Sequence, residues 1–433
     1  MTRFMALALG AFAAVIAAGS GLTQSTVEVL VHVTMDGEST DAMVVTTSAY
    51  GRTQVAYNEV RQPGLVRLSL SPGNYALRVE RGAGFTSAAV ERQITVYRGR
   101  PLELSVDLTR AFSPAASWGY YSADLHIHSS ASWDGFTPPD QLVAVQLAAD
   151  LDVGCITDHN TIAGHVSFTS AAEARGFPVI LSEEITSLDG HWNAFPLDSV
   201  VDYNLRKTPT DYFTEARAAG AQQIQACHPM HPLFGYFHLQ GRPKYDDTFD
   251  LVEIYSREFS REDTRTIERL YELWNEGYRY VAVGVSDDHN WRTLTRQAGR
   301  ARTYVHLEGE LTVEGWLDAL AAGRAYATYG PHVKFTAQEG TALPGDTVTL
   351  TDGEAFELAA EVVLVPRHGQ RALSRARVIR NGEVVEEVAL TGDRATVSWT
   401  DRPTADAWYA LTVQADDGDR AHSNPIWVTV TQD

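Results

Sequence analysis

Hydrophobic and polar positions alternate with a period of two over the first part of the chain. Between residues 25 and 110, the segments "STVEVLVHVTM", "LVRLSL" and "ALRVE" alternate or are rich in β-branched residues, and the turn "SPGNY" precedes the last of them. This pattern is typical of half-buried strands, and no stretch in this part has the period of a helix. We therefore predict an all-β sandwich domain over residues 23–113.

The pattern changes near Ser117, where short apolar runs begin to alternate with amphipathic stretches. The predicted strands are "SADLHIH", "VGCITDH", "PVILSEEIT", "QQIQACHP", "DLVEIYS" and "YVAVGVSDDH", and the predicted helices are "TPPDQLVAVQLAADLDV", "DTRTIERLYELW" and "TVEGWLDALAAG". We expect Thr137 to cap the first helix, with Pro138 in its first turn and Asp140 completing the cap. This alternation predicts an α/β domain over residues 114–331, as a parallel barrel or a doubly wound sheet.

The final part of the chain returns to short strand patterns. The segments "DTVTL", "AFELAAEVVLV", "RARVIRN", "ATVSW", "WYALTVQA" and "PIWVTV" are separated by turns rich in Gly and Asp. They predict an immunoglobulin-like β-sandwich over residues 332–433. A chain of 433 residues is long enough for two or three domains, so three parts fit its length.

The N-terminus has the features of a signal peptide. Arg3 supplies a positive charge, residues 4–18 are apolar, and small residues follow through Gly21. A membrane anchor is the alternative, but this apolar run is short for a spanning helix. We expect residues 1–22 to be cleaved, which would leave a secreted or periplasmic protein with no membrane attachment.

The net charge of −20 limits the choice of partners. A surface that binds a nucleic acid polymer needs clustered Lys and Arg, and the sequence has no such run, so we exclude that class of partner. A small anionic substrate stays compatible with the charge, because bound metal ions reverse the local field. Cys155 and Cys227 each lie in an apolar run. Export would allow a disulfide, but two buried free thiols are the favoured interpretation.

Side chains that bind metals stand at the ends of the strands predicted in the middle part. In chain order they are Asp124, His126 and His128; Asp158 and His159; Glu183 and Glu184; His228; Glu253; and Asp287, Asp288 and His289. Residues two apart on a strand point to the same face, so His126 projects with His128, and Asp287 with His289. Barrel enzymes place their chemistry at these strand ends. A set of imidazoles and carboxylates without thiolates indicates catalytic Zn, Mn or Fe.

Each motif alone has a simpler explanation. A His-x-His pair is often part of a core or a surface, and Asp-His arises by chance. The glutamate in "LVEIY" is different, because a carboxylate buried on a strand needs a partner. The coincidence of six strands, each ending in a ligand-type side chain, favours a metal centre over a structural origin.

The motif series "DLHIHSSASWDG", "ITDHN", "EEIT", "CHPMHP", "VEI" and "SDDHN" resembles that of the polymerase and histidinol phosphatase (PHP) superfamily. The segments "GHWNAFPL", "GRAYATYGP" and "SNPIWV" further resemble its carbaryl-hydrolase-like CehA/McbA branch. The resemblance implies a distorted seven-stranded (β/α) barrel that holds two or three divalent metal ions.

The resemblance also implies a ligand set. His126, His128, Glu184 and Asp287 would hold the first metal ion. Glu184 would bridge to a second ion, whose site His228 and Glu253 would complete. Asp134, His159 and His289 would hold a third, although many members of the family have His where this chain has Asp134. Glu184 is preferred to Glu183 because members of the family usually have Gly-x-Glu there, and "Ser-Glu-Glu" matches that pattern at its last residue. Only one of these two neighbouring residues can face inward on a strand.

Further side chains are candidates for catalysis and substrate binding. Two metal ions about 3.5–4 Å apart lower the pKa of a bridging water, so that hydroxide forms at neutral pH. His191 and His231 are candidate general acids by position. Asp158 and Asp288 are candidates for orienting ligating imidazoles, or are simple solvated or capping carboxylates. The candidates for the substrate pocket are Trp133, Trp192, Asn193, Arg257 and Tyr329.

Three functions are compatible with these residues. The first is hydrolysis of a small phosphoester, which needs Arg or Lys beside the metals, and Arg257, Arg261 and Arg292 follow metal-bearing strands. The second is hydrolysis of a carbamate, carboxylic ester or amide by the same metals. The third is a non-catalytic protein that binds metal, glycans or a surface. We expect an exported metal-dependent hydrolase, with a small phosphoester as the favoured substrate.

Overall fold

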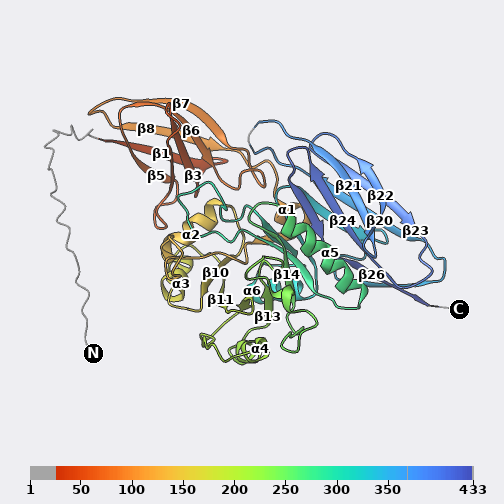
Figure 1. The fold of residues 1–433 in the computed structure, drawn as a ribbon. Coiled ribbons are helices and arrows are strands. Elements are labelled where there is room, and N and C mark those ends of the chain that lie inside the picture. The colour runs from red at the N-terminus through yellow and green to blue at the C-terminus, as the bar shows by residue number, and fades with distance from the viewer. Residues whose placement is uncertain (1–25, 368, 432–433) are drawn as a thin grey trace, which may run out of the picture.

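Eight strands form two four-stranded sheets on the N-terminal side of the molecule (Figure 1). The structure, a computed structural model, describes residues 26–367 and 369–431, so the predicted signal peptide lies outside the described residues. The strands are β1 (Val27–Met35), β2 (Glu38–Ser39), β3 (Met43–Ser48), β4 (Thr53–Tyr57), β5 (Leu65–Leu70), β6 (Gly73–Glu80), β7 (Val90–Val96) and β8 (Leu102–Leu108). Every second residue of β1 is buried between the sheets, as the alternation predicted.

A six-stranded sheet forms half of a barrel in the middle part of the chain. Its strands, in spatial order, are β10 (Gly154–His159), β11 (Val179–Thr186), β12 (His191–Phe195), β13 (Gln223–Ala226), β14 (Leu251–Ser256) and β15 (Val281–Val285). The helices are α1 (Pro114–Trp118), α2 (Pro139–Ala148), α3 (His165–Glu173), α4 (Pro209–Ala218), α5 (Arg261–Asn275) and α6 (Val313–Ala321), with a 3-10 turn η1 (Tyr236–Leu239). The sheet is not purely parallel, because β12 runs antiparallel to β11 and β13.

A second, nine-stranded sheet joins the middle part to the C-terminal part. It contains β9 (Tyr120–Ala123), β16 (Arg302–His306), β17 (Ala325–Thr328), β19 (Thr347–Thr351), β21 (Leu373–Arg380), β22 (Glu383–Ala389), β24 (Ala407–Ala415), β25 (Arg420–Ser423) and β26 (Ile426–Thr431). Strands β18 (His332–Ala337), β20 (Phe356–Val363) and β23 (Arg394–Asp401) form a separate sheet. Because β17 pairs with β25, one sheet crosses the boundary predicted between residues 331 and 332.

Helix α2 begins later than the sequence predicted. Pro138 is its N-cap residue, and no side chain makes a capping hydrogen bond there. The hydroxyl of Thr137 instead accepts a hydrogen bond from the backbone N–H of Trp291, at 3.2 Å. The physical reason is that Pro138 itself precedes a proline, Pro139, which disfavours helical backbone angles at Pro138.

Two further expectations have clear outcomes. Cys155 and Cys227 are both buried and free, which confirms the interpretation of two core thiols. Among the described helices, none combines the length and the apolar character that crossing a bilayer requires.

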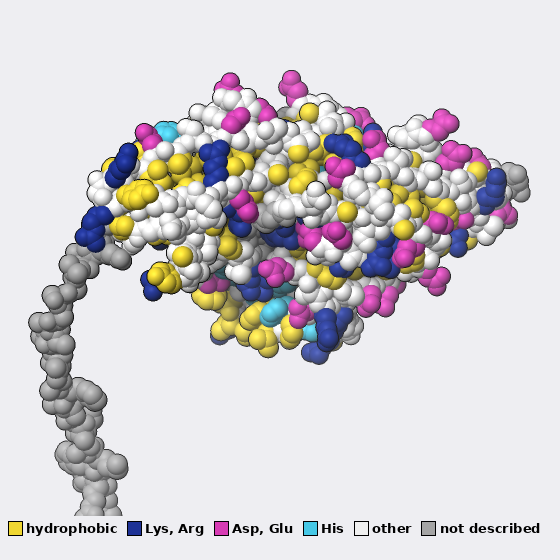
Figure 2. Space-filling view, turned by 90° about the horizontal axis from the view of Figure 1, so that it is seen from above, with side chains coloured by type: hydrophobic (Ala, Val, Ile, Leu, Met, Phe, Trp, Pro, Cys, Tyr) yellow, Lys and Arg dark blue, Asp and Glu magenta, His cyan; other side chains and the backbone are white. Residues whose placement is uncertain are grey.

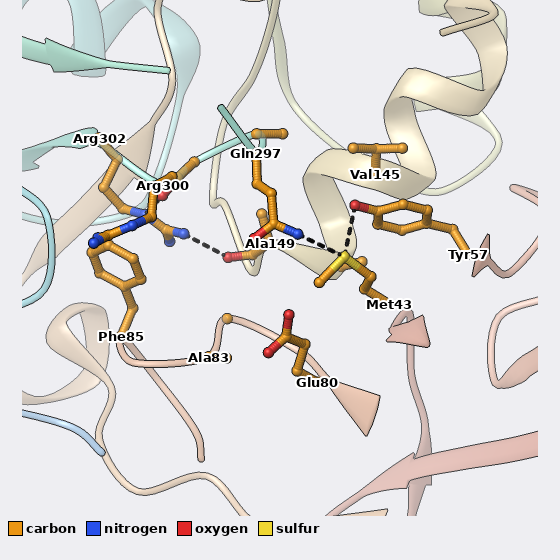
Figure 3. Close-up of a pocket in the computed structure, with 14 residues that line it drawn as sticks. Met43, Tyr57, Glu80, Ala83, Phe85, Val145, Ala149, Gln297, Arg300 and Arg302 are labelled. Carbon is orange, nitrogen blue, oxygen red and sulfur yellow. Dashed lines mark hydrogen bonds between the residues drawn. The ribbon is translucent and has the colours of Figure 1, made fainter. Parts of the chain in front are cut away.

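A small cavity of about 50 Å³ lies where the N-terminal sheets meet the middle part, and residues of both parts line it (Figure 3). The guanidinium of Arg302 lies over the ring of Phe85 at 3.7 Å and donates to the carbonyl of Ala149 at 2.9 Å. On the other side, Gln297 donates to the sulfur of Met43 at 3.0 Å. A cavity of this size holds one or two waters, not an organic substrate, so this contact joins two parts of the protein and is not the active site.

Two buried histidines tie the middle part to its neighbours as neutral rings. Nε2–H of His332 donates to the carbonyl of Phe85 at 2.7 Å, and Nδ1–H of His422 donates to the carbonyl of Ser423 at 2.7 Å. The remaining nitrogen of each ring faces a tyrosine hydroxyl. Burial lowers the pKa of His332 to about 3 and that of His422 to about 4.

These histidines predict a loss of stability in acid. An unfolded chain protonates histidine below about pH 6.5, whereas the folded rings resist protonation. The unfolded state therefore binds more protons as the pH falls from 6.5 towards 4, and the free energy of unfolding should decrease by about 2 kcal/mol or more per ring. Urea unfolding at pH 7 and pH 4 would measure this. The His422→Gln variant should have a smaller pH dependence, and an unchanged dependence would contradict the assignment.

Candidate metal centre

Residues 124–128 follow β9 in an extended course beside the end of β15. β9 ends at Ala123, earlier than predicted, and Asp124 accepts hydrogen bonds from the backbone of Ser286 and Gly299 at 2.9 and 2.7 Å. Backbone hydrogen bonds of 2.9 Å join the two segments, from Asp287 N–H to the carbonyl of His126 and from His128 N–H to that of Asp288. The imidazoles of His126 and His128 therefore face the Asp287 carboxylate.

Four donor atoms from three segments form the first group of candidate ligands. The Nε2 atoms of His126 and His128 are 3.1 Å apart. Glu184 Oε2 lies 3.3 and 3.4 Å from these two nitrogens, and Asp287 Oδ1 lies 3.4 Å from each. Donors held about 2.0–2.1 Å from one ion at tetrahedral angles are about 3.3–3.4 Å apart. Five of the six distances among these four atoms are thus close to those between donors around one metal ion.

Glu184 reaches a second group with its other carboxylate oxygen. Oε1 lies 2.8 Å from Nδ1 of His191 and 3.5 Å from Nε2 of His228. The hairpin of β11 and β12 explains the closeness of His191, because His191 pairs directly with Thr186, two residues beyond Glu184 and on the same face. Glu184 has the geometry of a bridging ligand, and Glu183 faces the other side, where it accepts a hydrogen bond from Val201.

Glu253 lies behind these groups, which corrects its predicted place among the ligands of the second ion. One oxygen accepts hydrogen bonds of 2.7 Å from Nδ1–H of His126 and from the amide of Gln225. The other accepts the backbone N–H of His228 at 2.6 Å. Glu253 therefore orients one imidazole and fixes the backbone beside another. His191 occupies the position beside Glu184 that we had expected for Glu253.

The third group contains the residues that the resemblance implied. Asp134 Oδ2 lies 3.3 Å from Nε2 of His159 and 3.1 Å from Nε2 of His289. The ring of His128 stacks between these two imidazoles, with centroid distances of 4.5 and 4.1 Å. The ring of His128 therefore borders both the first and the third group, and all three groups lie within one mouth of the half-barrel.

The residues present fit bound cations. Glu184 is buried, and its Oε2 faces Nδ1 of His159 at 2.9 Å but makes no hydrogen bond of good geometry with the described part of the chain. A buried carboxylate oxygen without such a bond is costly, and a cation would satisfy it. The Nε2 atoms of His126 and His128 face each other, and two such nitrogens need a proton or a cation between their lone pairs. The donor set is therefore that of a site for divalent metal ions.

The charged side chains in the mouth shift one another's pKa values. Burial raises the pKa of Glu184, but the nearby His126, His191 and His159 outweigh it and hold the pKa well below its ordinary value. Burial likewise opposes ionisation of Asp287, and the imidazoles of His126 and His128 still keep its pKa low. Burial lowers the pKa of His128 to about 4, so this ring is neutral at pH 7, the form that binds a metal ion.

Asp158 and Asp288 do not contact candidate ligand imidazoles, which corrects both predictions. Asp158 accepts hydrogen bonds of 2.7 and 2.6 Å from the backbone and hydroxyl of Ser129, so it holds the loop after His128 rather than acting in catalysis. Asp288 accepts from the backbone of Asn290 at 3.0 Å. Burial raises the pKa of Asp158 and raises that of Asp288 to about 7.

Three residues predicted to line the substrate pocket lie in the interior instead. Trp192 packs in the core, and Asn193 donates to the carbonyl of Leu125 at 2.9 Å. Tyr329 is buried, and its hydroxyl donates to the carbonyl of Ser256 at 3.4 Å. The period-two pattern of β12 places Asn193 on the inner face, below His191 and away from solvent.

Trp133, His231 and Arg257 do lie at the mouth. The ring of Trp133 stacks on that of His159, with centroids 5.6 Å apart. His231 is partly exposed, and its ring centroid lies 5.6 Å from that of His228. Arg257 donates from Nε to Asp287 Oδ2 at 2.6 Å, on the oxygen that faces away from the imidazoles.

A cavity of about 600 Å³ opens beside these groups. It is lined by Arg257, Glu258, Asp288, His289, Asn290, Thr293, Thr295 and Arg296. Burial, together with the neighbouring charge of Arg257, lowers the pKa of Arg296. The two guanidiniums therefore repel each other across a space that an anion would fill.

Sequence reasoning missed two residues, His191 as a candidate ligand and Arg296 as a pocket residue. The sequence did contain a signal for His191. Asp189 and Gly190 directly precede it, and an Asp-Gly pair between apolar segments favours a hairpin, which would have folded His191 back onto β11. Arg296 lies in an irregular loop with a left-handed backbone (φ +54°), and no periodic pattern indicates its position.

The comparisons with known proteins agree with this placement. Residues 124–290 match the family model of the PHP domain, and this range contains every member of the three groups. A protein of Methanocaldococcus jannaschii, named Uncharacterized protein MJ1587, is 28% identical over 144 residues, which cover 31% of this chain and 81% of that protein.

Solved structures with similar folds have low similarity scores. A two-domain protein of Bacteroides vulgatus, described as containing a predicted PHP-like metal-dependent phosphoesterase, aligns with 72% of this chain and 95% of its own, at 17% identity and a TM-score of 0.43. An amidohydrolase of Chromobacterium violaceum, solved with bound sulfate and no metal, aligns with 47% of this chain and 96% of its own, at 16% identity and a TM-score of 0.33.

The first group predicts the metal content of the purified protein. The wild type should carry at least two equivalents of Zn, Mn or Fe, measured by inductively coupled plasma mass spectrometry after gel filtration. The double variant His126→Ala/His128→Ala should lose at least one equivalent, because two of four donors are gone. The exposed His32, which pairs with Glu103 in the N-terminal sheets, offers a matched control. A wild type without stoichiometric metal would refute the assignment.

Proposed function

Because residues 124–290 of this chain form a PHP domain, we propose that the protein is a metal-dependent phosphoesterase that hydrolyses small phosphoesters. The observation that carries this proposal is the cavity with Arg257 and Arg296, which opens directly beside the candidate metal ligands. Guanidinium groups bind phosphate oxygens through charge-assisted hydrogen bonds, whereas a neutral carbamate or carboxylic ester does not need two cations.

The arginines are arranged to hold a phosphate next to the donor groups. Arg257 uses Nε and Nη2 on one oxygen of Asp287, and Nη1 has no partner among the described residues. Arg257 is held in a left-handed backbone conformation with φ +64°, which aims its side chain back towards the mouth. Arg296 is exposed in the same cavity, and Thr293 and Thr295 add hydroxyl groups. A phosphate in this cavity would meet two guanidiniums and lie beside His289.

The residues around the mouth then have different roles in the proposed hydrolysis. His126, His128, Glu184, His191, His228 and Asp287 would hold two metal ions, with Asp134, His159 and His289 as the site of a third. When bound, such ions supply a water activated at neutral pH and stabilise charge on the phosphoryl oxygens. We propose that the six strands of the half-barrel sheet, with β9, β16 and β17 beside them, enclose these sites as a distorted (β/α) barrel.

His231 is placed to hydrogen-bond the leaving group. Its Nδ1 accepts hydrogen bonds of 3.3 Å from the backbone N–H groups of Leu233 and Phe234. These bonds leave a neutral ring with its proton on Nε2, and the ring lies beside His228 and Arg257 in one cleft. Nε2–H can therefore donate a hydrogen bond to the alcohol oxygen that departs from phosphorus and stabilise the negative charge that develops on it, while water supplies the proton. We keep His231 as the candidate at the leaving group in this role, and place His191 among the ligands.

The two alternatives from the sequence differ from this proposal in testable ways. The same metal groups would also serve a carbamate, carboxylic ester or amide, and a non-catalytic protein would bind metal without turnover. A panel of p-nitrophenyl phosphate, a nucleotide ester, an aryl acetate and an aryl N-methylcarbamate separates them. Preferred turnover of the phosphoesters supports the proposal, and preferred turnover of the acetate or carbamate would replace it. Metal binding with no turnover would favour the binding protein.

We also propose that the protein acts outside the cytoplasm, on substrates that are neither nucleic acid polymers nor membrane-bound. The support is the charged, apolar and small-residue order of residues 1–22. N-terminal sequencing of the mature protein from a culture medium or a periplasmic extract tests this, and an intact N-terminus on a protein retained in the cytoplasm would refute it.

The paired arginines give a sharper kinetic prediction. Arg296→Ala should lower kcat/KM for p-nitrophenyl phosphate by about tenfold or more, because one charge-assisted hydrogen bond to the phosphate is lost. Turnover of any neutral ester should change little. Arg292→Ala is the matched control, since Arg292 lies on the same loop but does not line the cavity, and its guanidinium lies over the ring of Trp291 at 4.9 Å. Equal effects of the two substitutions would exclude Arg296 from phosphate binding.

A further inference from the structure

Large apolar side chains that are exposed to solvent gather on the loops around the metal centre. We call them the apolar collar: Trp133, Phe136, Leu188, Leu233, Phe234 and Leu294. Three of them, Leu188, Trp133 and Leu233, are 85, 81 and 75% exposed. Figure 2 shows hydrophobic side chains gathered beside exposed histidine atoms at the lower edge of the molecule.

Each collar residue lies on a loop that also carries a candidate ligand. Trp133 and Phe136 flank Asp134, and the backbone of Phe136 donates to the carbonyl of His289 at 2.8 Å. Leu188 lies in the turn of the β11–β12 hairpin, three residues before His191. The other three follow His228 or His289 in the chain. The collar therefore borders the mouth on several sides, and its side chains do not belong to a core.

Two collar rings touch the imidazoles of the centre directly. Trp133 stacks on His159 at an angle of 22°. Phe234 stacks on His191 with centroids 5.0 Å apart, and on His231 at 5.0 Å and 8°. The apolar surface is therefore continuous with the donor groups.

Such a surface is unusual without a ligand. Soluble proteins rarely keep large apolar side chains exposed together, and contiguous patches of this kind mark binding sites. Exposed apolar residues elsewhere in the described chain, such as Tyr50, Tyr97 and Val384, come from separate strands and loops. The collar residues instead share one location, at the point where a substrate must enter.

We propose that the collar binds an alkyl chain of the substrate, so that the preferred substrates are phosphomonoesters of apolar alcohols, free in solution. This inference rests on the proposed phosphoesterase function. The phosphate lies between Arg257 and Arg296, and the chain lies across Trp133 and Phe234. In the hydrolysis, the P–O bond to the alcohol breaks, water supplies the new oxygen on phosphorus, and its proton ends on the departing alcohol.

A homologous series of substrates tests the collar. We would measure kcat/KM for methyl, butyl, hexyl and octyl phosphate with the metal-loaded enzyme, below the concentrations at which the longer chains form micelles. Full burial of one methylene is worth about fourfold in binding, so a chain that lies on the collar should gain about twofold or more per methylene. Equal kcat/KM along the series would overturn the inference while leaving the phosphoesterase intact.

Variants locate the effect. The double variant Leu188→Ser/Leu233→Ser should flatten the dependence of kcat/KM on the length of the alkyl chain. In the proposal the two leucines contact the alkyl chain of the substrate, and they do not stack on the imidazoles. Tyr50→Ser/Tyr97→Ser is the matched control, since it removes two exposed rings from the N-terminal sheets and should keep the wild-type slope. A slope that survives loss of the leucines, or that falls equally in the control, would overturn the inference.

A binding measurement separates the two proposals if no phosphoester is hydrolysed. Octylphosphonate and methylphosphonate carry a P–C bond that cannot be hydrolysed, and calorimetry on the metal-loaded protein gives their affinities. Tighter binding of octylphosphonate, reduced in the leucine variant, supports the collar even if turnover fails. Equal affinities for octylphosphonate and methylphosphonate would overturn the inference. So would a protein that adsorbs to neutral phosphatidylcholine vesicles but does not distinguish the two phosphonates.

Discussion

The carboxylate of Glu184 is buried inside the mouth. The positions of most residues around it follow from its need for positive charge and hydrogen-bond donors. Its two oxygens face different groups, with His126 and His128 on one side and His191 and His228 on the other. A carboxylate without solvent is tolerable only with positive charge and hydrogen-bond donors nearby. The β11–β12 hairpin, the extended segment after β9 and the strand ends of β10 and β13 converge to supply imidazoles at that point.

A layer of buried polar groups behind the imidazoles holds this convergence in place. Glu253 orients the ring of His126, and Asp158 ties down the loop that leads from His128 to Asp134. Arg257 uses the oxygen of Asp287 that faces away from the imidazoles. Most of these side chains are nearly or fully buried, so packing against the sheet fixes their positions. This packing keeps the distances between the candidate donor atoms constant.

Much of this arrangement could be predicted from the sequence, and the failures have common physical causes. Period-two alternation predicted strands, and the polar residues at their ends predicted the candidate ligands that the structure brings together, His126, His128, His159, His228 and Asp287. The antiparallel strand β12 was missed, because its fully buried residues do not alternate. That error misplaced His191 and Asn193 together. Asp158 and Asp288 were misjudged because sequence spacing says nothing about which backbone groups need an acceptor.

The shared sheet has a consequence for how this protein can be divided or recombined. Strand β17 hydrogen-bonds to β25, so the backbone of the middle part is completed by residues nearly a hundred positions further along the chain. A shortened polypeptide ending after residue 331 would present Tyr326 to Thr328 as an open edge, ready to pair with any passing strand. Evolution could therefore exchange the N-terminal sheets, which join the rest through side chains at a small cavity, more easily than the C-terminal strands. The part that matches the PHP domain and the C-terminal strands are therefore expected to be inherited together.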